Sequence, residues 1–345
     1  MRVKRENLTV VLNRLYDRGE ERFTVSHPAS EIGDLLEIIL EDDGHCTVRF
    51  ITDSEEYAKA LGDVQRTYPE TVAKDLPDVR QFCNAVVASG VLELENTDEI
   101  QTFLNRYGDP DLMAGHAPVL AGFDTNLLPW RIDRILGLHD PDAGLGYVNG
   151  FVMATGIRDE LDWDYKCHDT TPFEDAFGEA FVEYWNQPTG AARLGRLGLL
   201  TYRRIRDIEQ AIEVQSERGD GNIINAYDTY DREYRSDILL FSNDRNFVEQ
   251  ARAHRMLGQR VDFPSEFPRS TTATWAEIEE LLFMLATLFG IIKVPSMTLY
   301  GVWRGKDELD WQYERVKVMT RSPPLESNLK ADLSIVESYE ELTTD

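Results

Sequence analysis

The feature that most constrains the fold is an alternation of short apolar segments with helical patterns between residues 118 and 263. The apolar segments are Pro118–Phe123, Tyr147–Ala154, Asp237–Phe241 and Arg260–Phe263. Strands that alternate with helices are typical of a mainly parallel sheet with helices on both faces. The sequence therefore predicts an α/β domain over residues 113–265.

The segments on either side of this domain have different patterns. In residues 1–112, helical spacing accompanies two strands around the turn Glu41–Gly44, which predicts an α+β accessory domain without an assigned role. The apolar run Leu281–Val294 is shorter than the roughly 20 residues of a membrane span and predicts a buried helix followed by a strand. Residues 266–322 are therefore expected to form a helix and a β-hairpin, and residues 323–345 a loose acidic tail.

Acidic residues are in large excess along the whole chain. The 345 residues include 62 Asp and Glu against 36 Lys and Arg, a formal net charge of -26. This excess argues against a general affinity for polyanions, because phosphate contacts require basic groups. Acidity spread over the full length is expected of a halophilic protein, since a salt-rich cytoplasm screens the repulsion. Three cysteines without paired spacing and a charged N-terminus also favour a cytoplasmic protein over a secreted one.

Acids follow two of the predicted strands and begin one of the predicted helices. Asp124 follows Val119–Phe123, and Asp244 comes soon after Ile238–Phe241. Open α/β sheets build their sites at the carboxyl ends of strands, so neighbouring strands would bring these two acids together. Asp220 stands at an expected helix start. Each acid also has a structural interpretation, because Asp is common in turns and as a helix cap.

Three motifs in this order resemble the PIN-domain ribonucleases. They are Asp124-Thr125-Asn126, the helix start from Asp220 to Ala226, and Ser242-Asn243-Asp244-Arg245-Asn246-Phe247. The resemblance covers residues 119–264 and neither flank, and the stretch from Leu161 to Gly219 is longer than in compact members. It implies that the catalytic and metal-binding acids are Asp124, Glu160, Asp220 and Asp244, supported by Asn126, Ser242 and Asn246. Asn246 stands where many relatives have a further acid, which leaves the number of metal ions open.

Clustered carboxylates suit hard divalent cations. Mg²⁺ and Mn²⁺ prefer oxygen ligands, lower the pKa of bound water and neutralise phosphate charge. The resemblance therefore implies a Mg²⁺- or Mn²⁺-dependent endoribonuclease that hydrolyses RNA phosphodiester bonds with a metal-activated water. Two alternatives remain open: a catalytically degenerate PIN-like module that binds RNA or protein, and a structure-specific DNA nuclease. The sequence contains no P-loop and no Gly-x-Ser-x-Gly motif, which argues against nucleotide hydrolases and serine esterases.

A basic segment interrupts the acidic chain. Residues 184–206 contain several arginines and no acid. On a helix, four of them would form one stripe that we expect to contact single-stranded or structured RNA, namely Arg193, Arg196, Arg203 and Arg204. The alternative is that these arginines pair with acids of the same fold. No membrane partner is expected, and a homodimer is compatible with the sequence.

Overall fold

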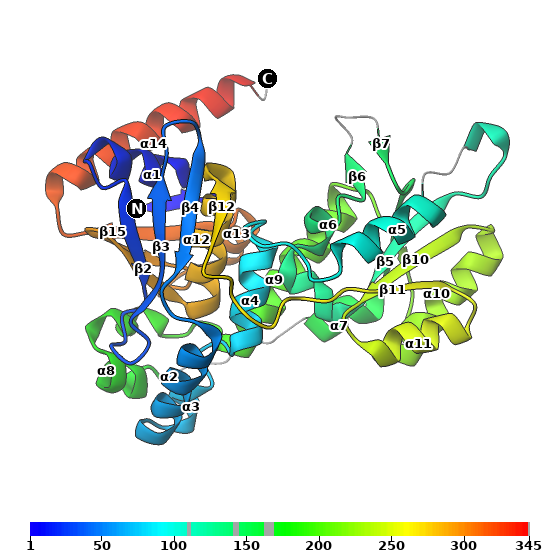
Figure 1. The fold of residues 1–345 in the computed structure, drawn as a ribbon, viewed down its shortest axis with the longest axis horizontal. Helices are drawn as coiled ribbons and strands as arrows, with labels where there is room; N and C mark the ends of the chain where they lie inside the picture. Colours follow the sequence, from blue (N-terminus) through cyan, green and yellow to red (C-terminus); the bar gives the residue numbers. More distant parts are fainter. Residues whose placement is uncertain (109–111, 141–144, 162–168, 344–345) are drawn as a thin grey trace. The chain divides into compact units, whose positions relative to one another are not determined.

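The computed structural model of the chain describes residues 1–108, 112–140, 145–161 and 169–343 (Figure 1). The chain forms a mixed α/β fold with two compact units, each assembled from segments that are distant in sequence. The first unit comprises Met1–Leu92, Tyr165–Arg193 and Ser265–Asp345, and the second comprises Glu93–Asp164 and Leu194–Pro264.

The first unit is built on an eight-stranded antiparallel sheet in the order β1-β15-β14-β13-β2-β3-β4-β12. Its strands are β1 (Arg2–Lys4), β2 (Arg22–Ser26), β3 (Asp34–Leu40), β4 (His45–Phe50), β12 (Ser270–Thr274), β13 (Ile291–Val294), β14 (Met297–Tyr300) and β15 (Arg315–Thr320). The two ends of the chain share this sheet, because β1 pairs with β15 and β2 pairs with β13. The accessory domain and the C-terminal extension, which the sequence analysis treated as separate, are therefore parts of one unit.

Helix α12 (Trp275–Phe289) forms the centre of this unit. Thr274 and Glu277 cap its first turn reciprocally, and every residue from Ile278 to Phe289 is buried. The helix packs against α4 (Val79–Ala88) and α1 (Thr9–Asp17). The prediction of a buried helix followed by a strand is confirmed. The other helices of the unit are η1 (Arg5–Asn7), α2 (Ser54–Thr67), α3 (Glu70–Ala73), α8 (Thr171–Phe177), η4 (Glu179–Tyr184), α13 (Glu308–Gln312) and α14 (Pro323–Thr343).

The C-terminal segment differs from its prediction in two places. Strands β14 and β15 pair as the expected hairpin, but α13 occupies part of their connection and contains Trp311. The acidic tail is helical rather than loose, since α14 runs over most of it and packs on α1. Leu325, Leu329 and Leu333 are buried at four-residue spacing, which gives this acidic helix one apolar face to pack.

The second unit contains a five-stranded parallel sheet in the order β11-β10-β5-β8-β9. Its strands are β5 (Val119–Phe123), β8 (Gly150–Ala154), β9 (Ile212–Val214), β10 (Asp237–Ser242) and β11 (Leu257–Arg260), and the short strands β6 (His139–Asp140) and β7 (Leu145–Gly146) form a separate pair. The expected parallel sheet is therefore present. Strand β11 begins earlier than predicted because Arg255, with a φ of 67°, turns the chain directly out of the preceding helix. Strand β9 was not predicted because Ile212 and Glu213 are exposed and form no apolar run.

The helices of the second unit precede the parallel strands or follow them along the chain. They are α5 (Thr97–Tyr107), η2 (Leu112–Ala114), η3 (Thr125–Trp130), α6 (Ile132–Ile135), α7 (Thr155–Leu161), α10 (Asp220–Tyr234) and α11 (Arg245–Ala253). Helix α9 (Gly190–Asp207) begins in the first unit and continues into the second. The stretch between Leu161 and Gly219 is long because part of it, from α8 to the start of α9, belongs to the other unit. No helix in the described ranges is both long and apolar enough to cross a membrane.

Candidate functional site

The carboxyl ends of β5 and β10 meet at the middle of the parallel sheet. The two strands pair in register from Val119 with Asp237 to Phe123 with Phe241. The chain adds β8 and β9 on one side of β5, and then β10 and β11 on the other side. This reversal is the topological switch point at which open α/β sheets leave a crevice for ligands. Asp124 and Asp244 follow the two strands that flank it.

Asp124 is a buried carboxylate held by neutral groups. It is 3% exposed, and its Oδ2 accepts hydrogen bonds from Ser242 Oγ at 2.6 Å and from Asn126 Nδ2 at 3.3 Å. The pKa of Asp124 is raised to about 6, mainly by burial and also by the carboxylates of Asp220 and Glu160, whereas the Ser242 hydrogen bond opposes the shift. Asp124 is therefore a site where a negative charge is costly unless a cation is close.

Glu160 reaches the same edge of the sheet from α7. Its carboxylate accepts hydrogen bonds from the Thr125 hydroxyl and from the Gly219 backbone N–H, the latter at 2.8 Å. Thr125 directly follows Asp124, and Gly219 directly precedes Asp220. Glu160 therefore links the ends of the two segments that carry the neighbouring acids.

A close backbone contact holds Asp220 near Glu160. The loop before α10 lies so near α7 that a Cβ on Gly156 would stand 2.2 Å from the Glu217 carbonyl oxygen. Ser216 Oγ accepts a hydrogen bond from the Gly156 N–H at 2.9 Å. Asp220 is the first residue of α10, and the N-cap position of this helix is occupied by Gly219. Burial raises its pKa, as do the charges of Asp244 and Glu160.

Asp244 has a second role in the fold. It is the N-cap of α11, where its Oδ1 accepts a hydrogen bond from the Asn246 N–H at 2.7 Å. Its own N–H donates to Ser242 Oγ at 2.8 Å, so Ser242 joins Asp244 to Asp124. Asn246 contributes its backbone to this cap, and its side chain is exposed.

The four acids lie at one edge of the sheet. In the described part of the chain, no Lys, Arg or His forms an ion pair with Asp124, Glu160, Asp220 or Asp244. Among the same described residues, however, no three His, Cys, Asp or Glu side chains are arranged to hold one metal ion. Several of their oxygens instead accept hydrogen bonds from Ser242, Thr125, Gly219 and Asn246. The role of the four acids as metal ligands stays a prediction.

The predicted arginine stripe is wrong at Arg193. This side chain is fully buried, and its guanidinium donates to both carboxylate oxygens of Asp75 at 3.0 and 2.9 Å and to the Leu288 carbonyl. It therefore cannot contact RNA without unfolding. Arg204 pairs with the buried Asp133 at 3.2 Å and with Glu209. For these two arginines the alternative interpretation, pairing with acids of the fold, holds, whereas Arg196 and Arg203 are half-buried on the same helix.

Two residues that organise the site were not assigned a role from the sequence. Thr125 orients Glu160, and its place beside Asp124 in the first motif is a signal that could have indicated this. Tyr227 is buried in α10, and its hydroxyl donates to the Phe123 carbonyl and accepts from the Ala154 N–H, each at 3.2 Å. It thereby ties together the ends of β5 and β8. A single tyrosine on an amphipathic helix carries no sequence signal for such a contact.

Comparisons with protein-family models, with curated proteins and with solved structures found no match to this chain.

Proposed function

We propose that the second unit is a PIN-like, metal-dependent endoribonuclease with its active site at the edge formed by Asp124, Glu160, Asp220 and Asp244. The observation that carries this proposal is the register of β5 and β10. It puts two strand-end acids at the switch point of a parallel sheet, with two further acids beside them and no ion pair to a basic side chain among the described residues. The order of the three sequence motifs is the second support.

The donor set fits a divalent cation in its chemistry. Carboxylate oxygens are the ligands that Mg²⁺ and Mn²⁺ prefer, and within the described ranges the buried Asp124 forms no ion pair with a basic side chain. A cation bound to these oxygens would supply an activated water and neutralise phosphate charge. Binding requires that Glu160 exchange its hydrogen bonds to Thr125 and Gly219 for the ion, because the carboxylates are not arranged for a metal in the present conformation.

The residues of the chain itself have separate roles in this proposal. Ser242 positions Asp124 through its hydroxyl and Asp244 through the backbone. Thr125 and Gly219 hold the Glu160 carboxylate at the edge, where it would be one of the residues that bind the ion. The apolar strands beneath exclude water from one side of Asp124, which keeps its charge dependent on the cation.

The test compares the wild type with Asp124→Asn. The variant should lose Mn²⁺-dependent cleavage of single-stranded RNA, while its metal-free form unfolds at the same or higher temperature. The reason is that a pKa raised to about 6 marks an ionised carboxylate that costs the fold about 1–3 kcal/mol at neutral pH. Mn²⁺ should stabilise the wild type by mass action and stabilise the variant much less.

Asp237→Asn is the matched control. Asp237 lies at the opposite end of β10 and is exposed, so this variant also loses one charge but should keep cleavage and the full stabilisation by Mn²⁺. Undiminished cleavage by Asp124→Asn, or equal Mn²⁺ stabilisation of it and the wild type, would remove Asp124 from the site. Binding of RNA without any cleavage by the wild type would favour the non-catalytic module. Cleavage of DNA flaps but not RNA would favour the DNA nuclease.

A further inference from the structure

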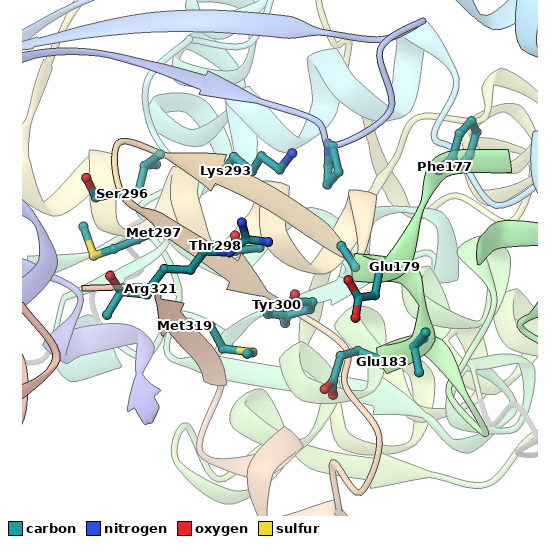
Figure 2. Close-up of a pocket in the computed structure, with 15 residues that line it drawn as sticks. Phe177, Glu179, Glu183, Lys293, Ser296, Met297, Thr298, Tyr300, Met319 and Arg321 are labelled. Carbon is teal, nitrogen blue, oxygen red and sulfur yellow. The ribbon is translucent and has the colours of Figure 1, made fainter. Parts of the chain in front are cut away.

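The first unit contains a polar pocket of about 800 Å³ on one face of its antiparallel sheet. This volume lies within the roughly 300–1,000 Å³ of typical small-molecule sites. Strand register defines its floor, because Lys293 on β13 is opposite Thr298 on β14, which is opposite Met319 on β15. Tyr300 shares the face of Thr298, two residues further along β14. Figure 2 shows these side chains together, with η4 on one side of them.

Two cations of this pocket are not used by the fold. Lys293 and Arg321 line it, and neither forms an ion pair with an acid in the described residues. In contrast, Lys317, which is opposite Tyr300 on β15, forms an ion pair with Glu183 at 2.9 Å. In a chain with a net charge of -26, two basic side chains on one pocket that have no ion-pair partner among the described residues form a local site for an anion.

The hydroxyl groups of the pocket favour an anion with several oxygens. Thr298 is opposite Lys293 in the strand register, and Ser296 and Thr320 also line the cavity. An arginine fork, a lysine ammonium and neighbouring hydroxyls together match the tetrahedral oxygens of a phosphate group.

An acidic residue of η4 limits which chemical groups the ligand can carry besides the phosphate. Glu179 lies in the pocket on the side away from Ser296 and forms no ion pair with a described residue (Figure 2). A carboxylate there repels a second phosphate and therefore disfavours a continuous polyanion. It accepts hydrogen bonds from vicinal hydroxyls, as acidic residues do when they recognise a ribose.

From these contacts we propose that this pocket binds a small phosphorylated sugar, of the size of a mononucleotide. Lys293, Arg321 and Thr298 hold the phosphate, and Glu179 accepts hydrogen bonds from the sugar hydroxyls. The exposed side chain of Met319 offers an apolar surface for the remainder. The site is independent of the proposed nuclease chemistry, because all its residues belong to the first unit.

The test is calorimetric titration of the full chain with adenosine 5′-monophosphate, inorganic phosphate and adenosine in parallel. The monophosphate should bind saturably at one site and more tightly than either fragment. Lys293→Ala and Arg321→Ala should each lower the affinity for the monophosphate by about tenfold or more, because each removes a charge-assisted contact. Glu179→Gln should lower the affinity for the monophosphate and leave the affinity for inorganic phosphate unchanged or higher.

Matched controls separate a site from the general effect of charge. Lys59→Ala on α2 and Arg80→Ala on α4 remove exposed cations elsewhere in the same unit and should leave the affinity unchanged. Asp124→Asn should also bind the monophosphate normally, even if it abolishes cleavage. Circular dichroism of every variant verifies its fold. The proposal is overturned if binding of the monophosphate does not saturate, if the control variants lose as much affinity, or if the pocket variants bind the monophosphate as tightly as the wild type.

Discussion

The fold accommodates three buried ionisable side chains, those of Arg193, Asp124 and His27, in three different ways. Arg193 is paired with Asp75, and Asp124 is left with neutral donors and acidic neighbours. His27 stays neutral: its Nδ1 accepts the Ala29 N–H at 3.2 Å, and its Nε2 has no hydrogen-bond partner in the described structure. The pKa of His27 is lowered to about 3, mainly by burial and also by the charges of Arg193 and Lys293.

His27 should make the stability of the fold depend on pH in a defined direction. The unfolded chain takes up the imidazole proton near pH 6.5 and the folded chain only near pH 3, so His27 disfavours the folded state as the pH falls through this window. When the pH falls from neutral to about 5, the free energy of unfolding, measured in urea, should decrease by about 2 kcal/mol more for the wild type than for His27→Leu. His45→Leu, which changes an exposed histidine, should follow the wild type. Parallel pH profiles of wild type and His27→Leu would contradict the prediction.

At the scale of elements, α9 illustrates a helix whose charge pattern predicted the wrong surface. The spacing of its arginines indicated one stripe, but the helix begins in one unit and continues in the other. Its first turn therefore lies among residues of the antiparallel unit. There Arg193 donates hydrogen bonds to the Asp75 carboxylate and to the carbonyl oxygens of Pro188 and Leu288. The spacing of the arginines indicated a basic face if the segment is helical, and only the neighbouring elements decided what that face contacts.

Loss of the buried Arg193 should strongly destabilise the protein. Arg193→Leu leaves the Asp75 carboxylate buried without its partner, which typically costs about 3–5 kcal/mol. The double variant with Asp75→Leu should recover much of this loss, because it removes both charges. Chemical unfolding of the two single variants and the double variant measures the coupling. Arg206→Leu, which breaks an exposed pair with Asp207, should cost at most about 1 kcal/mol. Additive losses at Arg193 and Asp75 would show that the pair is not coupled.

At the scale of the whole molecule, the dominant property is the net charge of -26. Many acids pair locally, as Glu37 does with Arg22 and Arg49, but the excess remains unpaired overall. Repulsion among these carboxylates opposes the compact state and is reduced by salt.

Stability should therefore increase with ionic strength. The midpoint of thermal unfolding should rise as KCl increases from about 0.05 to about 1 M, most steeply at the low end, where the Debye length is still longer than the spacing of surface charges. The gain should be smaller near the acidic end of the stable pH range, because protonated carboxylates no longer repel. Differential scanning fluorimetry over a KCl series measures this. A midpoint that is independent of salt or falls with it would contradict the halophilic interpretation.

Local sequence patterns predicted much of the parallel unit. Alternating apolar segments and turn residues identified β5, β8 and β10, because a strand buried on both faces needs a continuous apolar run. Strand-end position alone marked Asp124 and Asp244 as neighbours, given that the two strands pair in parallel. Glu160 was found only through the family resemblance, since its spacing on α7 carries no signal of its own.

Pairing between distant segments was decided only by the tertiary structure. The joining of β1 with β15 and of β2 with β13 merged two expected domains into one, and the packing of α14 on α1 ordered a tail whose charge predicted a loose chain. Burial of Arg193, the hydrogen bonds that occupy Glu160 and the pocket beside η4 have the same origin. The physical reason is that these features depend on which surfaces exclude water from each other, and a local pattern records only that a residue is apolar or charged. The sequence by itself determined where strands end in acids, and the fold determined which of those acids meet.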